Sequence, residues 1–146
     1  MPGIIVGVDG SGHSQRALEW AAKEAALRKA TLTVLTVNQA VAGFWGGTLS
    51  YAQDPEFTER AREAAQAETD KVLAGLSGSR PPSVTVKAVT GIPAEELINA
   101  SRDADMIVVG SRGAGGFARM VMGSVSSQVA QHAHCPVLII RGQGRD

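Results

Sequence analysis

The chain has 146 residues with 14 basic and 14 acidic side chains, so its formal net charge is zero. This length suits one domain with a core of its own. The balanced charge excludes the basic footprint that DNA, RNA or an anionic membrane surface would require. No apolar run approaches the ~18 residues of a membrane span, and no basic segment precedes the first apolar run. With Cys135 as the single cysteine, these features predict a soluble cytoplasmic domain over residues 1–146.

Short β-branched runs alternate along the chain with stretches of helical periodicity, a pattern typical of buried strands and amphipathic helices. The sequence predicts five strands, at Ile4–Val8, 31–37, 84–89, 106–109 and 137–141. It predicts four helices between them, at 14–29 with Ser11 or Ser14 as the cap, about 55–76, from Pro93 onward, and about 124–132. This alternation indicates an α/β fold, an open parallel five-stranded sheet with helices on both faces.

Residues 38–55 lack any clear period and contain three glycines, so we expect a long, mobile, variable loop there. Phe44, Trp45 and Tyr51 lie within it. These aromatic residues fit three roles equally well: a lid over a ligand, a surface for a partner, or a dimer contact.

The segment from Gly110 to Ser126 follows the fourth predicted strand and ends in the last predicted helix. Glycines allow a close backbone approach to a ligand, and the N–H groups of a helix start attract anions. Ser124 and Ser126 add hydroxyl donors. The cations of the segment are Arg112 and Arg119, the second of which is either a phosphate ligand or a solvated side chain. Two arginines are few for a triphosphate, so we expect Mg²⁺ or Mn²⁺ to accompany it.

General nucleotide motifs do not account for this segment. A P-loop requires Gly-Lys-Ser/Thr, and no lysine follows Lys87. The dinucleotide fingerprint requires a third glycine where Ala118 stands. From these residues alone, the prediction is an anion or nucleotide site.

The spacing Gly110-x2-Gly113-x9-Gly123-Ser124 resembles the ATP-binding signature of the universal stress protein family. The strand Ile4–Val8 with Asp9-Gly10-Ser11 after it, the helix start Gly91-Ile92-Pro93, and the run His134–Leu138 resemble that family as well. The likeness covers nearly the whole chain, and residues 38–55 match least.

The resemblance implies the ATP-binding branch of that family, the strand order 3-2-1-4-5 and a homodimer joined through the last strand, Val137–Arg141. It implies that Asp9 contacts the ribose or the metal, and that the backbone of Val37 meets the adenine. It also implies that Val109 and Gly110 pack against the nucleoside. The residues expected at the phosphates are Arg112, Gly113, Gly123, Ser124, Val125 and Ser126.

Simpler roles stand beside these. Asp9 fits a capping role at the first helix or at the turn before it, and Cys135 before an apolar strand fits an inert buried thiol better than a nucleophile. His13 lies near Asp9 in the sequence, but no second metal-binding residue stands at a ligand spacing from it. We expect no catalytic residue, because the glycine-rich segment holds no candidate base and no G-x-S-x-G occurs.

The function we expect is an ATP-dependent stress-response regulator with little or no hydrolysis. Three alternatives remain: a slow ATPase, a cyclic-AMP-binding module, and a dimeric adaptor that acts without a nucleotide.

Overall fold

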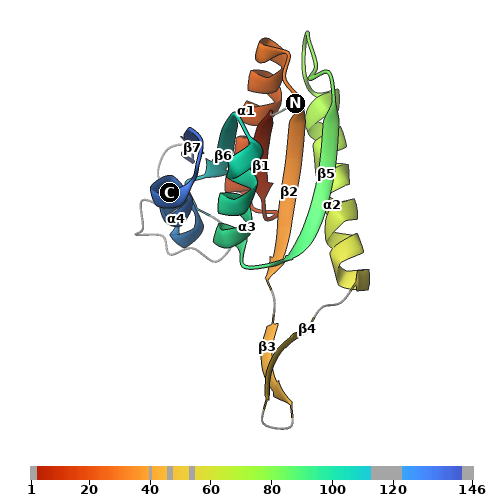
Figure 1. Cartoon of the computed structure of the whole chain (residues 1–146). Helices are drawn as coiled ribbons and strands as arrows, with labels where there is room; N and C mark the ends of the chain where they lie inside the picture. The colour runs from red at the N-terminus through yellow and green to blue at the C-terminus, as the bar shows by residue number, and fades with distance from the viewer. Residues whose placement is uncertain (1–2, 40, 46–47, 53–54, 113–122, 143–146) are drawn as a thin grey trace.

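The computed structural model describes residues 3–39, 41–45, 48–52, 55–112 and 123–142 (Figure 1). Its strands are β1 Ile4–Val8, β2 Leu32–Gln39, β3 Val41–Trp45, β4 Thr48–Ala52, β5 Val84–Gly91, β6 Met106–Gly110 and β7 Val137–Ile140. Its helices are α1 Gly12–Arg28, α2 Pro55–Ala74, α3 Pro93–Ala100 and α4 Ser124–His132, with a short 3₁₀ helix η1 at Ser101–Asp103. Within these described ranges, none of the helices has the length and apolar character to cross a membrane.

Five strands form one parallel sheet in the spatial order β5-β2-β1-β6-β7. When the five strands of this sheet are numbered in chain order, their spatial order is 3-2-1-4-5. The predicted fold is therefore confirmed. The order reverses between β1 and β6. In open α/β sheets, ligands bind beyond the carboxyl ends of the strands at such a reversal.

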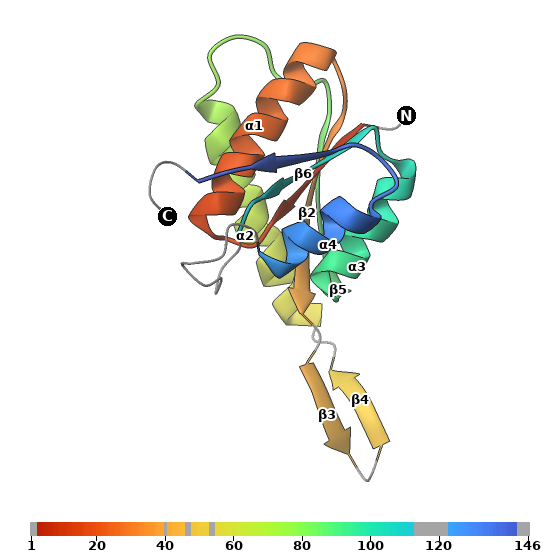
Figure 2. The same cartoon turned by 90° about the vertical axis from the view of Figure 1, so that its left-hand side faces the viewer.

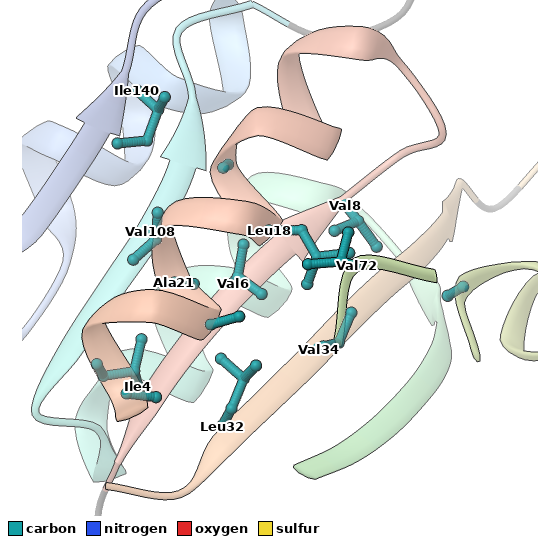
Figure 3. Close-up of a cluster of buried hydrophobic side chains, with 14 residues drawn as sticks. Ile4, Val6, Val8, Leu18, Ala21, Leu32, Val34, Val72, Val108 and Ile140 are labelled. Atoms are coloured by element: carbon teal, nitrogen blue, oxygen red, sulfur yellow. The ribbon is translucent and has the colours of Figure 1, made fainter. Parts of the chain in front are cut away.

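Helices cover both faces of the sheet, with α1 and α2 on one side and α3 and α4 on the other (Figure 2). Leu18 of α1 and Val72 of α2 pack with Val6 and Val34 of the sheet in the core of the first side (Figure 3). Along β2, Leu32 and Val34 belong to this core, whereas Leu35 and Val37 belong to the other. Even-numbered residues of β2 therefore face α1 and α2, because strand side chains alternate between faces.

The prediction of a loop without regular structure over residues 38–55 is wrong. β2 continues through Asn38, and β3 and β4 form an antiparallel hairpin that extends away from the sheet (Figures 1 and 2). Trp45 and Thr48 form the last described pair of the hairpin before its turn. The sequence between that pair is Gly46-Gly47, a dipeptide that favours two-residue hairpin turns, and strand-forming residues flank it. The roles of Phe44 and Tyr51 depend on side chains outside the described structure.

Candidate functional site

The turn after β1 is held by side-chain hydrogen bonds. The backbone N–H of Ser11 donates to Asp9 Oδ1 at 2.9 Å, and the N–H of Asp9 donates to Ser14 Oγ at 3.2 Å. Gly10 has φ +84°, which a side chain would strain. Ser11 is the N-cap of α1, and its Oγ accepts the N–H of Ser14 at 3.2 Å. Asp9 thus organises the turn, as the simpler reading proposed, while its carboxylate stays at the end of β1.

Gly110 joins the carboxyl end of β6 to the start of α1. A Cβ at this position would lie 2.9 Å from both the carbonyl carbon and the carbonyl oxygen of His13. Backbone atoms of a helix cannot yield as a flexible side chain can, so glycine is required here. This close approach places the ends of β1 and β6 beside one another, at the reversal point of the sheet.

Ser111 connects three elements at this edge, although sequence reasoning did not single it out. Its N–H donates to the carbonyl of Ile140 in β7 at 2.8 Å. Its carbonyl accepts the N–H of Gly123 at 2.5 Å and the hydroxyl of Ser126 at 2.8 Å. Ser111 is buried, so these bonds fix the start of α4 against the ends of β6 and β7.

Ser126 therefore has a positioning role that was not anticipated. It is buried, and its hydroxyl lies within hydrogen-bond distance of both the Ser111 and Gly123 carbonyls. Ser124, by contrast, is exposed at the first position of α4. A phosphate contact therefore suits the Ser124 hydroxyl better than the Ser126 hydroxyl. The N–H of Gly123 already donates to the Ser111 carbonyl, so the expectation that Gly123 holds a phosphate through this group is not met, whereas Val125 presents its N–H in the first turn of α4.

We expect Ser126→Ala to lower the free energy of unfolding by about 1 kcal/mol, because it removes the buried hydroxyl that ties α4 to β6. The melting temperature should fall by roughly 3 °C. Ser124→Ala should leave the melting temperature unchanged and weaken nucleotide binding. Calorimetric melting and isothermal titration of the two variants check this contrast; equal thermal stability of both would refute the positioning role.

The apolar residues predicted at the site are part of the core on the α3 and α4 side. Val109 is buried there, and Val37 and Val125 pack against the same cluster. Since Val8 pairs with Thr36 across β1 and β2, the backbone of Val37 lies level with the turn at Asp9. The structure thus brings Val37, Asp9 and Gly110 to one edge of the sheet.

The remaining predicted phosphate ligands are only partly described. Arg112 is half-buried directly after Ser111, whereas Gly113 and Arg119 lie outside the described residues. Within the described ranges, no group of three His, Cys, Asp or Glu side chains has the geometry of a metal site. A Mg²⁺ ion brought by a nucleotide still fits the donors present, because the Asp9 carboxylate is the kind of oxygen ligand that Mg²⁺ prefers.

Two polar residues on the α1 and α2 side were missed in the sequence. Asn38 follows Val37 in β2 and faces α2, and Glu68 lies on the buried stripe of α2 with Ala65 and Val72. Asn38 Nδ2 and Glu68 Oε1 are both shielded from solvent, and among the described residues neither has a hydrogen-bond partner. Buried polar atoms without a partner are uncommon and costly, which marks this pair for a role.

Burial raises the pKa of Glu68 above its usual 4.5, and the nearby Asp9 carboxylate raises it further while Lys71 opposes the shift. A carboxyl group whose pKa is higher in the folded state stabilises the fold at low pH and loses that contribution as pH rises from the unfolded to the folded pKa. We therefore expect Glu68→Gln to raise the melting temperature by a few degrees near neutral pH. Below about pH 4 the variant and the parent should melt together; a gain of the same size at both pH values would refute the account.

Cys135 is only partly buried, which differs from the buried thiol expected from the sequence. Burial raises its pKa, although a hydrogen bond from the backbone of Ile107 lowers it in part. A raised pKa reduces the thiolate fraction that a nucleophile requires.

The family model described as "Universal stress protein family" matches residues 2–141. The chain belongs to the universal stress protein family. Universal stress protein Rv1996 of Mycobacterium tuberculosis is 37% identical over 155 residues, an alignment that covers 98% of this chain and 49% of the relative. The chain thus spans about half the length of the curated universal stress proteins it matches.

Solved universal stress proteins share the fold. UspA from Lactobacillus plantarum is 28% identical with a TM-score of 0.78, over 96% of this chain and 97% of that one. A universal stress protein solved in complex with cAMP is 25% identical with a TM-score of 0.66, over 96% of each chain. One from Archaeoglobus fulgidus, solved in complex with dAMP, is 25% identical with a TM-score of 0.62, over 96% of this chain and 98% of that one.

Proposed function

We propose that this universal stress protein binds an adenine nucleotide, ATP in preference, and acts as a nucleotide-dependent regulator of the stress response. The observation that carries the proposal is the junction at Ser111. Its hydrogen bonds fix the start of α4 against the ends of β6 and β7, and the neighbouring Gly110 packs on the first turn of α1, which follows the Asp9 turn, at the reversal point of the sheet. The cAMP and dAMP complexes of two related structures support an adenine nucleotide as the ligand.

Each part of this edge has a task in the proposal. The first N–H groups of α4 and the exposed Ser124 hydroxyl hold phosphate oxygens at the positive end of the helix dipole. Arg112 completes the phosphate site from the β6 side, and Gly113, which lies outside the described residues, stays an expected ligand. The Asp9 carboxylate binds a ribose hydroxyl or the Mg²⁺ ion that the nucleotide carries, and the backbone of Val37 meets the base. Mg²⁺ supplies charge neutralisation for the triphosphate when it is bound.

Isothermal titration with ATP and Mg²⁺ tests the proposal. We expect one site per chain and a higher melting temperature with the nucleotide, since a ligand that binds only the folded state stabilises it. The absence of both heat and a thermal shift at millimolar ATP would overturn the proposal. Competition by cyclic AMP in the same titration decides between the two nucleotides, because one phosphate occupies the helix start without needing Arg112 or Mg²⁺.

Little or no ATP hydrolysis is part of the proposal. Phosphoryl transfer requires a base that orients the attacking water, together with strong charge neutralisation. Asp9 Oδ1 already accepts the N–H of Ser11, which commits part of that carboxylate to the turn. Steady phosphate release that Asp9→Ala abolishes would instead establish a slow ATPase.

We also propose a homodimer through the last strand, Val137–Arg141. β7 pairs with β6 on one side and forms an edge of the described parallel sheet. Exposed apolar edge strands invite pairing with a second chain, and Val137, Leu138 and Ile139 are only half-buried. Sedimentation at micromolar concentration measures the oligomeric state. A monomer that keeps full nucleotide affinity would show that nucleotide binding does not depend on dimer formation.

A further inference from the structure

Two buried polar atoms near the proposed nucleotide site have no partner among the described residues. One is a donor, Asn38 Nδ2, and the other is an acceptor, Glu68 Oε1. Leaving such atoms unsatisfied costs free energy, so a missing hydrogen-bond partner is the simplest physical explanation for both.

The topology places Asn38 at the edge where a base would lie. The pairing of β1 with β2 ends at Val8 and Thr36, so Asn38 extends two residues beyond it, next to the turn at Asp9. Its even position in β2 directs it to the side of α1 and α2, where Leu32 and Val34 pack. Asn38 thus stands one residue after the backbone that the resemblance assigns to adenine.

Glu68, on α2, lies toward the same edge of the sheet. It lies one turn before Val72, which packs beside Val8 and Leu18 (Figure 3). Since α2 begins at the carboxyl edge of the sheet (Figure 1), one turn toward its start brings Glu68 closer to that edge than Val72 is. The electrostatic influence of Asp9 on Glu68 places their two carboxyl groups in one neighbourhood.

We propose that Asn38 and Glu68 recognise the amino edge of the adenine base and make the site selective for adenine over other purines. This inference rests on the proposed function, because it concerns the base of the same nucleotide. Adenine presents an acceptor, N7, beside a donor, its 6-amino group, whereas guanine presents two acceptors, N7 and O6. Asn38 Nδ2 donates to the ring nitrogen, and Glu68 Oε1 accepts from the 6-amino group.

Glu68 is the residue that discriminates. An ionised carboxylate only accepts hydrogen bonds, so it pairs with an amino group and opposes a carbonyl oxygen at the same ring position. The amide of Asn38 both donates and accepts, and therefore contributes affinity for any purine with less selectivity. A site built in this way rejects a base with oxygen at position 6 because the shielded Oε1 of Glu68 would face that oxygen without a donor.

The test compares ATP with inosine triphosphate, which differs at position 6 of the base. We expect the parent chain to bind ATP at least about tenfold more tightly than inosine triphosphate. Glu68→Gln should bring the ratio close to one, since the glutamine amide both donates and accepts. Glu63→Gln, an exposed change on the same helix, should leave the ratio as in the parent. Asn38→Leu should weaken both nucleotides by a similar factor.

The outcomes separate the two proposals. Equal affinity of the parent for both nucleotides, or an unchanged ratio in Glu68→Gln when its melting curve shows a folded chain, overturns base recognition by this pair and leaves ATP binding intact. No binding of either nucleotide to the parent overturns the proposed function and this inference with it.

Discussion

Gly110→Ala should lower the free energy of unfolding by about 2 kcal/mol and abolish measurable nucleotide binding. The added methyl group would lie 2.9 Å from backbone atoms of His13, so α1 and β6 must move apart. That movement separates the Asp9 turn from Ser111, the two halves of the proposed site. A melting temperature lower by roughly 4–8 °C is the expected readout, together with loss of the titration heat.

The chain supplies a matched control in the same region. A Cβ at Gly12, in the first turn of α1, would meet no atom within 4 Å. Gly12→Ala should therefore keep the nucleotide affinity and leave the fold as stable or slightly more stable, because alanine restricts the unfolded chain. If Gly110→Ala melted and bound ATP as Gly12→Ala does, the junction between β6 and α1 would not matter to the site.

The second large effect concerns charge at the end of β1. Asp9→Asn should weaken Mg²⁺-dependent ATP binding by about tenfold or more while the fold stays stable, because the amide oxygen still accepts the N–H of Ser11. Asp9→Ala should lose both the affinity and about 1 kcal/mol of stability, because the turn then lacks its acceptor. Titration and thermal melting of the pair measure the two losses separately.

The two Asp9 variants also provide a check on each other. Asp9→Asn removes one of the causes that raise the pKa of Glu68, so the stabilising effect of Glu68→Gln near neutral pH should become smaller in that background. If Asp9→Asn bound ATP like the parent while Asp9→Ala did not, Asp9 would be a residue of the turn alone.

The sequence predicted the sheet well because each buried parallel strand is a short β-branched run. Ile4–Val8 and the run before Gly110 carry that signal without ambiguity, and the alternation with helices leaves few topologies. The hairpin β3–β4 was missed because its glycines were read as signs of a mobile loop. Gly46-Gly47 between strand-forming residues was the available signal for a turn.

The site was predictable only where a motif marks it. Gly110, Gly123 and Asp9 stand at element boundaries, where chain order alone brings them to one edge. Ser111 acts through its backbone groups, which no sequence pattern distinguishes. In the sequence, Glu68 looks like any other charged residue of a surface helix, and its partial burial follows from the packing of α2 on the sheet.

Backbone nuclear magnetic resonance of the chain during addition of ATP and Mg²⁺ tests the central claim most directly. We expect saturable shifts in the amide signals of the Asp9 turn, of Ser111 and Arg112, and of the first turn of α4. The amides of α1 beyond its second turn and of the amino end of β5 should stay unchanged. Shifts confined to other surfaces, or no shifts at millimolar ATP, would contradict a nucleotide site at the junction of β1, β6 and α4.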